Sequence, residues 1–399
     1  MAGEGEIYFP EPIIQRIQSF LTGKEAARTA ILSKSWHGAW LTRPNLDFDD
    51  TYFRVNDYRN CSSYVDKFKK YARTTIKRYE QSNLRIESFK LRMHFDKYHR
   101  ADFAEEYILK ALGVGAIRLC LRLKRSGLFV LPNEVFEVDN LVELSVSGCR
   151  IKLDDRVVIK CRRLESLSLD KVRGITIDTV SKIVSSCPSI EKFSLLSEFY
   201  QEYRFCPKAT AMAVGVVDNL IPRLRCLVLS YASFKALCLD ELLSRFPFLK
   251  DFSLYLNHCT DTILEEGIQI SNRSLERIKL VLKGFARHID RRRLRVKFDV
   301  PSVRKFTFEG DDIPCLSFMS IPTSREWESH LSIKCLTTFW FNDLSKLLTE
   351  LSRSKTHLSL TVGSDTVSFA YNVEDKIVQG LRKHKLENLR VHTMVLPPL

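Results

Sequence analysis

The sequence lacks the motifs that mark the common classes of enzyme. It contains no P-loop, no H-E-x-x-H metal motif and no G-x-S-x-G nucleophile elbow. Gly113 and Gly115 are spaced like the start of a dinucleotide-binding loop, but the third glycine that such a loop needs is missing. We therefore expect a non-catalytic protein that carries no cofactor.

Paired cysteines are also missing. The chain has eleven cysteines, an odd number, and none of them forms a C-x-x-C pair, so the pattern signals neither a disulfide framework nor a zinc site. We expect free thiols in a reducing compartment, buried as small apolar residues, with Cys149, Cys161 and Cys187 at strand or turn positions.

Long apolar segments are absent as well. No uncharged run approaches the roughly 18 residues of a membrane-spanning helix, and Met1–Glu6 holds two acidic residues and no basic, apolar leader. We therefore expect a soluble, unsecreted protein of the cytoplasm, the nucleus or both, with no membrane partner. Its 399 residues, 45% of them hydrophobic, leave room for two or three globular domains or one elongated array.

Basic residues are in excess, with a formal net charge of +14 and an isoelectric point near 9.2. Such an excess suits phosphate-rich partners. The densest run, Arg291–Lys297, nevertheless alternates with apolar Leu294, Val296 and Phe298, the pattern of a strand with one buried face. No zinc-finger, RNA-recognition or helix-turn-helix pattern accompanies it. The run is more typical of solvated charge than of a nuclear-import signal, and we do not predict nucleic-acid binding.

Three short helical patterns stand near the N-terminus. Apolar residues at 13, 14, 17, 20 and 21 repeat at helical spacing, and Pro12 suits a first helical turn because its missing N–H would be unbonded there. Lys24–Leu32 and Ser35–Leu41 predict a second and a third helix. Because a unit of about forty residues seldom encloses its own core, the rest of the chain or a partner must cover its remaining apolar face.

These residues resemble the F-box. Its pattern begins with a Leu-Pro pair, continues with a Val-Ser-Lys-x-Trp stretch and ends with a stretch like Leu-Asp-Phe. The counterparts are Phe9-Pro10, Leu32–Trp36 and Leu46–Phe48, with Phe9 in place of the usual leucine. The resemblance covers residues 9–49 and implies docking on a Skp-type adaptor and, through it, on a cullin. The positions that it implies form or support the docking surface are Pro10, Ile14, Ile17, Leu21, Leu32 and Trp36. The alternative is that some of them, Trp36 above all, form the internal core.

From about residue 83 onward the chain repeats a short strand pattern. The prolines at 188, 222, 247 and 301 each come just before an apolar frame Φ-x-x-Φ-x-Φ, and the same frame recurs elsewhere without proline. Between residues 141 and 303, successive frames start 23 to 34 residues apart. One such unit cannot close a core, but stacked units can. The spacing therefore indicates a solenoid.

The repeats resemble the long, irregular leucine-rich repeats found behind an F-box in plant F-box/leucine-rich-repeat proteins. The resemblance covers residues 83–395 and implies an α/β fold, in which a small three-helix F-box precedes parallel strands on a concave face and helical or irregular segments on a convex face. Thr179–Ser186 and Asp240–Arg245 are the most helix-like return segments. Residues 50–82 predict a linking amphipathic helix, whose apolar face consists of Val65, Phe68, Ala72 and Ile76.

The resemblance implies a function as the substrate-recognition subunit of a Skp–cullin–F-box ubiquitin ligase, with the repeats binding an unknown protein target. The alternatives are a stand-alone repeat scaffold whose F-box is only an N-terminal cap, and a small-molecule co-receptor. Because side chains alternate along a strand, residues between the inward apolar positions face the concave surface. The substrate-binding residues predicted there are Lys192, Asp251, Tyr255, Arg277, Lys279, Lys305 and Glu309, around a middle column of mostly small side chains.

Overall fold

The chain forms two compact units. The computed structural model describes residues 9–53, 61–95, 101–124, 129–154, 156–173, 175, 177–196, 221–231, 237–257, 267–283, 294–311, 313–320, 322, 327–335, 340–363 and 386–394. Unit 1 comprises Met1–Ile175 with Ser186–Ser189, and unit 2 comprises Thr176–Ser185 with Ile190–Leu399. Among the helices described, none combines the length and the apolar character that crossing a membrane requires.

Unit 1 begins with three short helices, as predicted: α1 (Glu11–Ser19), α2 (Gly23–Thr29) and α3 (Lys34–Thr42), which we call the N-terminal module. Local capping explains where they start. Thr22 and Glu25 form a reciprocal capping box at the start of α2, and the Ser33 hydroxyl accepts a hydrogen bond from the Trp36 backbone N–H at the start of α3. Each cap satisfies backbone donors that the first helical turn leaves unpaired.

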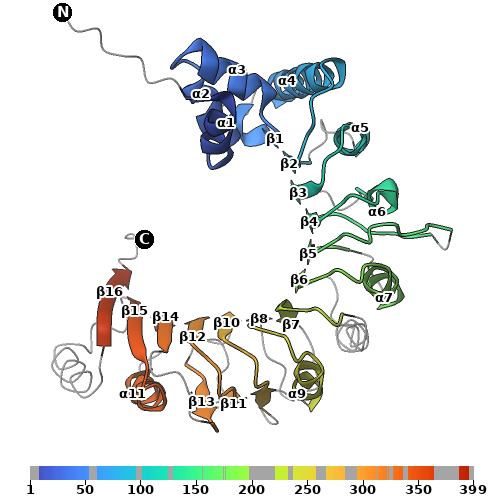
Figure 1. Ribbon diagram of the computed structural model, residues 1–399. Helices are drawn as coiled ribbons and strands as arrows, with labels where there is room; N and C mark the ends of the chain where they lie inside the picture. The colour runs from blue at the N-terminus through green and yellow to red at the C-terminus, as the bar shows by residue number, and fades with distance from the viewer. Residues whose placement is uncertain are drawn as a thin grey trace, which may run out of the picture. The chain divides into compact units, whose positions relative to one another are not determined.

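The rest of unit 1 is a row of parallel strands with helices between them. The strands are β1 (Asn45–Asp49), β2 (Ser88–His94), β3 (Arg118–Lys124), β4 (Glu143–Ser147) and β5 (Ser166–Asp170), in that order. The connecting helices are η1 (Asp50–Phe53), α4 (Cys61–Gln81), α5 (Ala101–Gly113) and α6 (Glu134–Glu137), and α4 to α6 lie along one side of the strands (Figure 1). Alternate apolar side chains of the strands point into the core, and the register places Leu119 opposite Leu144 and Leu144 opposite Leu167.

Two predictions about this region can be compared with the structure. Val65, Phe68, Ala72 and Ile76, the predicted apolar face of the linking helix, are all buried in α4. The predicted boundary at residue 49 falls at the end of a strand. Residues 45–49 form β1, which pairs with β2, so the end of the segment that resembles an F-box is already the first strand of the sheet.

The described part of unit 2 continues the same design with eight parallel strands. They are β6 (Lys192–Leu196), β7 (Cys226–Tyr231), β8 (Asp251–Asn257), β10 (Arg277–Lys283), β12 (Lys305–Gly310), β14 (Glu328–Cys335), β15 (Lys355–Gly363) and β16 (Leu386–Met394). The helices are α7 (Ile177–Ser186), α9 (Leu237–Ser244) and α11 (Trp340–Glu350), and α7 and α9 lie where the return segments were predicted. The predicted α/β class, with parallel strands stacked as in a leucine-rich-repeat solenoid, is confirmed.

A second, three-stranded sheet in unit 2 was not predicted. Its strands are β9 (Ile268–Ser271), β11 (Arg295–Asp299) and β13 (Cys315–Phe318), in the order β9-β11-β13. It lies on the same side of the main strands as α9 and α11 (Figure 1). In β11 the basic side chains Arg295 and Lys297 face outward while Val296 and Phe298 are fully buried. The prediction of a half-buried basic strand is confirmed here, and residues 291–293 of that run lie outside the described residues.

Aromatic rings join the two sheets of unit 2. The Phe298 ring of β11 lies 5.5 Å, centroid to centroid, from the Phe306 ring of β12 and stacks at 4.9 Å on the Phe318 ring of β13. Trp327 contacts the far side of this cluster, with its ring 5.5 Å from Phe318. Large rings that pack edge-to-face contribute both buried area and a directional interaction, so this cluster fixes the second sheet against the first.

Three cysteines of unit 1 lie in the core, as predicted. Cys149, Cys161 and Cys187 are buried and unpaired, and the Cys161 thiol donates to the carbonyl oxygen of Phe136 at 3.3 Å. Burial raises the pKa of each thiol to about 12, because an apolar environment disfavours the thiolate. These cysteines are therefore protonated, unreactive core residues at neutral pH.

We expect these thiols to make the unfolding of unit 1 sensitive to alkaline pH. Their ordinary pKa of 9.0 is raised to about 12 on folding, so their contribution to stability is complete below pH 9 and is lost as the pH rises from 9 towards 12. Urea unfolding in the presence of reductant should show a midpoint that falls between pH 8 and pH 10.5. A variant with all three cysteines changed to alanine should show a smaller fall, and an equal fall in both proteins would contradict the assignment.

Candidate functional site

The N-terminal module exposes apolar side chains although it lies in a folded unit. Ile13, Ile17 and Phe20 repeat at helical spacing along one face of α1, and the residues that follow α2 add two more. We call the exposed residues Phe9, Ile13, Ile17, Phe20, Ile31 and Leu32 the N-terminal apolar set. Ile31 is 88% exposed and Phe20 74%. Several large apolar side chains that stay in water within one small module are typical of an interaction surface.

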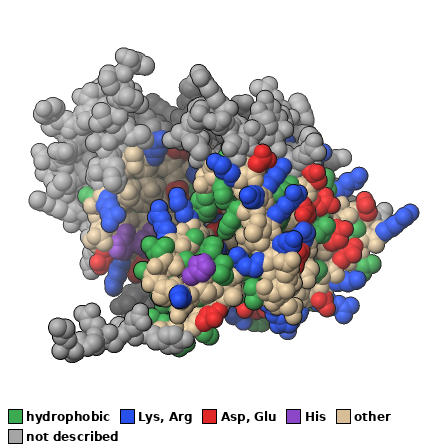
Figure 2. Space-filling view, turned by 90° about the horizontal axis from the view of Figure 1, so that it is seen from above, with side chains coloured by type: hydrophobic (Ala, Val, Ile, Leu, Met, Phe, Trp, Pro, Cys, Tyr) green, Lys and Arg blue, Asp and Glu red, His purple; other side chains and the backbone are tan. Residues whose placement is uncertain are grey.

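The face of the molecule on which the module lies carries both apolar and charged side chains. Figure 2 shows the molecule from above, with hydrophobic side chains gathered beside lysines and arginines in one part of the view and charges of both signs in another. The Arg16 guanidinium lies 4.8 Å from the centre of the Phe20 ring. Such a cation–π contact supports the outward position of Phe20.

The six predicted adaptor-binding residues do not all lie on this surface. Pro10, Ile17 and Leu32 are exposed, while Leu21 and Trp36 are half-buried. Ile14 is 1% exposed and belongs to the core of the module, so it supports a surface from beneath and cannot itself touch a partner. Phe20 and Ile31 were missed. The spacing 13-17-20 on one helix was the available signal, because it places Phe20 beside Ile17 and away from Ile14.

A buried glutamine ties the three helices together. The Gln18 side-chain amide of α1 donates to the Trp36 carbonyl oxygen at 3.2 Å and to the Thr29 hydroxyl at 3.0 Å. Thr42, at the end of α3, donates to the Glu11 carboxylate at 2.5 Å. Hydrogen bonds to a fully buried amide restrict the helices to one arrangement, so the N-terminal apolar set is presented on a rigid support.

The module is also attached to the first strands of unit 1. The Gly23 backbone N–H donates to the Asp47 carboxylate of β1 at 3.2 Å, and a Cβ added at Gly23 would lie 3.0 Å from the Asp47 carbonyl oxygen. The Tyr79 hydroxyl of α4 donates to the Arg43 carbonyl oxygen at 2.6 Å. A glycine at this contact permits the close approach of α2 to β1.

A hollow of about 740 Å³ lies between the module and the strands of unit 1. Its basic lining residues include Arg16, Lys90, Arg92, Arg118 and Arg122. Three acidic residues of the lining, Asp47, Asp49 and Glu143, offset part of this charge, and Arg92 pairs with the buried Asp49 at 3.0 Å. The lining therefore keeps an excess of basic residues.

The predicted substrate-binding residues share the open face of the main sheet in unit 2, the surface opposite the helices and the second sheet. The strand register orders that face into rows. The first row is Lys192, Cys226, Asp251, Arg277, Lys305, Glu328 and Lys355. The second row is Ser194, Val228, Ser253, Lys279, Thr307, His330, His357 and Asn388, and the third includes Tyr255, Val281, Glu309, Ser332, Ser359 and Arg390. The predicted middle column of mostly small side chains is thus one continuous row.

Contacts on this face join five of the seven predicted residues into two groups, a pair within the first row and a group of three between the second and third rows. Arg277 forms an ion pair with Asp251 across the strands, with its second guanidinium nitrogen 2.6 Å from the carboxylate. The Lys279 ammonium lies 3.4 Å from the Glu309 carboxylate and 5.7 Å from the centre of the Tyr255 ring. Lys192 and Lys305 lie in the Arg277 row, on β6 and β12. The hydrogen bonds and charge of Asp251 raise the pKa of Arg277 further, so this cation is permanently charged.

The histidines at the C-terminal end of the second row were not predicted as site residues. The apolar frame is weak around Leu331–Phe341, so the strand was hard to place there. The usable signal was the alternation of Glu328, His330 and Ser332 with the buried residues of β14. This alternation puts an imidazole on the open face.

Comparison with known proteins agrees with this architecture. No family model matches the chain. An F-box/LRR-repeat protein of Arabidopsis thaliana is 28% identical over 211 residues, which cover 49% of this chain and 37% of that relative. A second, described as a putative F-box/LRR-repeat protein of the same plant, is 30% identical over 198 residues, which cover 47% of this chain and 40% of the relative. The chain thus matches less than half the length of these relatives, and it is a homologue of plant F-box/LRR-repeat proteins.

Proposed function

We propose that the protein is the substrate-recognition subunit of a Skp–cullin–F-box ubiquitin ligase. The N-terminal module docks on a Skp-type adaptor, the adaptor joins a cullin, and the open face of unit 2 binds a target protein. The protein performs no chemistry of its own in this role. It works in the cytoplasm, the nucleus or both, a location supported by buried free thiols such as Cys161.

The observation that carries the proposal is the N-terminal apolar set. Large apolar side chains cost free energy in water, about 25 cal/mol per Å² of apolar surface. The module keeps Phe20 and Ile31 outside although it buries Ile14, Gln18 and Ala39. A partner that covers these side chains removes that cost, which is the role that the F-box resemblance assigns to a Skp-type adaptor.

Affinity purification of the full chain from its native source, with the proteasome inhibited, tests the proposal. A Skp-type adaptor and a cullin should co-purify, and a target protein should accumulate on the chain because its degradation is blocked. Recovery of a target protein with neither adaptor nor cullin would contradict the proposal and favour the stand-alone scaffold.

We expect the Tyr255→Ala and Arg277→Ala double variant to bind that target at least about tenfold more weakly, because tyrosine and arginine dominate binding hot spots. The exposed Arg277–Asp251 pair contributes at most about 1 kcal/mol to folding, so the variant should remain folded. Adaptor binding should not change. The matched control is Arg273→Ala, which removes an exposed arginine before β10. Unchanged affinity in the double variant, measured by titration of the purified target, would exclude this part of the open face.

A further inference from the structure

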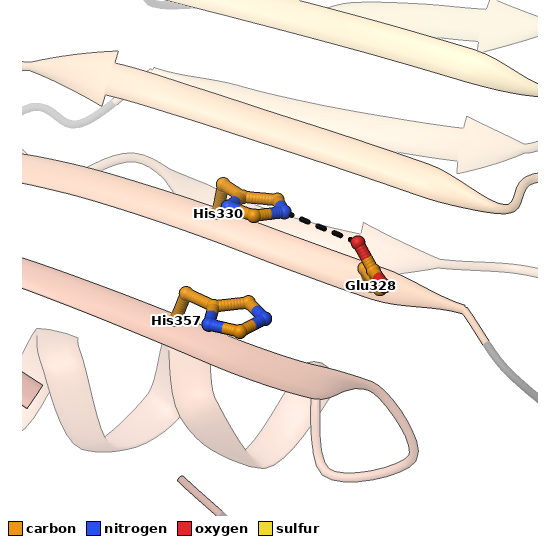
Figure 3. Close-up of side chains that lie close together, drawn as sticks. All are labelled: Glu328, His330 and His357. Carbon is orange, nitrogen blue, oxygen red and sulfur yellow. Dashed lines mark hydrogen bonds and ion pairs between the residues drawn. The ribbon is translucent and has the colours of Figure 1, made fainter. Parts of the chain in front are cut away.

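Two histidines and a glutamate converge on β14 and β15 of unit 2 (Figure 3). His330 and His357 are cross-strand neighbours, and Glu328 lies two residues before His330 on the same strand face. One ligand atom from each residue lies within 4.8 Å of the other two. Both histidines are half-buried and the carboxylate is exposed, so an ion can reach the group from solvent.

The spacing between the first two ligand atoms suits a bound metal ion. The His330 Nε2 atom lies 3.3 Å from a Glu328 carboxylate oxygen. Zinc bonds of about 2.0–2.1 Å in tetrahedral geometry place neighbouring ligand atoms about 3.3–3.4 Å apart. An ion can therefore take the place of the hydrogen bond between this pair with little movement of either side chain, and the ligand atom of His357 lies within 4.8 Å of both.

The two imidazole rings stack face to face, with their centroids 4.6 Å apart and an interplanar angle of 13°. The stack holds the two imidazoles side by side on neighbouring strands. Neutral imidazole is the form that binds a metal ion.

Asn388 of β16 orients the second histidine. Its side-chain Nδ2 atom is placed 3.0 Å from His357 Nδ1. When the amide is turned so that its oxygen faces the ring, it accepts the Nδ1 proton and leaves the Nε2 lone pair for a metal ion. Histidine ligands commonly have such an outer hydrogen-bond partner, which fixes the tautomer. The group therefore has three ligands and one supporting residue.

We propose that Glu328, His330 and His357 bind a divalent transition-metal ion, with Asn388 as the orienting residue. Two imidazoles and one carboxylate suit zinc, and they leave a fourth position on the open face for water. The site lies at the end of the second row and involves neither the adaptor surface nor the residues tested with a target protein. The proposed metal site does not depend on the proposed ligase function.

Titration of the full chain with zinc chloride, followed by calorimetry at pH 7.5, tests the site. The wild type should bind zinc at one site whose affinity falls at least tenfold in the His330→Gln and His357→Gln double variant. The matched control, His37→Gln, removes an exposed histidine of α3 and should bind as the wild type does. Equal zinc affinity and stoichiometry in the wild type and the double variant would overturn the proposal, since zinc would then occupy other groups such as the cysteines.

Two further measurements sharpen the test. Zinc should raise the melting temperature of the wild type more than that of the double variant, because the three-ligand site exists only in the folded state. Lys305 lies opposite Glu328 in the register and repels a cation there, so Lys305→Met should tighten zinc binding. Weaker binding in that variant would contradict the assignment of Glu328 as a ligand.

Discussion

The Phe20→Asp and Ile31→Asp double variant should fail to bind a Skp-type adaptor. Each substitution removes an exposed apolar side chain whose burial against a partner contributes about 1.5–3 kcal/mol. Each also places a carboxylate where the partner would have to desolvate it. Together the two changes should lower the affinity at least about hundredfold, as measured by calorimetry with purified adaptor.

Folding should survive these substitutions, because both side chains already lie in water. The matched control is Val158→Asp, which places the same charge at another exposed apolar residue of unit 1, outside the module. This control should bind the adaptor like the wild type. A folded Phe20→Asp and Ile31→Asp variant with full adaptor affinity would show that the N-terminal apolar set is not the docking surface. Ile14→Asp is unsuitable for this purpose, because it would disrupt the core of the module.

The Phe298→Ala variant should lose about 3–5 kcal/mol of unfolding free energy, the usual cost of truncating a buried phenylalanine. Phe298 is fully buried and contacts both Phe306 and Phe318, so its removal opens the contact between the two sheets of unit 2. Urea denaturation of the full chain measures the effect as a lower stability of unit 2.

Phe248→Ala provides the control for that measurement. Phe248 belongs to the same unit but is 63% exposed, so its truncation should change the stability by less than about 0.5 kcal/mol. Equal losses in the two variants would mean that the aromatic cluster does not hold the second sheet against the first.

The main strands could be predicted because their signal is local. Frames such as Leu164, Leu167 and Leu169 end in alternating apolar residues, and every second side chain must be buried wherever such strands stack. The helices α7 and α9 were predictable for the same reason. The repeat spacing then determined the order of the strands without any knowledge of long-range contacts.

The second sheet could not be predicted in the same way. β11 has the alternation of a strand, but its neighbours β9 and β13 are four residues long and lie far from it in the sequence. Their pairing depends on where the chain between the main strands folds back. Periodicity within one segment carries no information about such a pairing.

The candidate surfaces, too, were predictable only in part from the sequence. The sequence placed Ile14 among residues that form or support the docking surface, but it did not separate the two roles, because adjacent apolar residues in α1 look alike without their neighbours. The packing of Gln18 and Ile14 inward decides which face of α1 stays exposed. The histidine pair became visible only when the register placed His357 beside His330.

Direct binding of the purified full chain to a purified Skp-type adaptor is the measurement that tests the central claim most directly. The account predicts a complex with one copy of each protein on size-exclusion chromatography, and its loss in the Phe20→Asp and Ile31→Asp variant. A folded wild-type chain that elutes separately from the adaptor at micromolar concentration would contradict the claim that this protein is a ligase subunit.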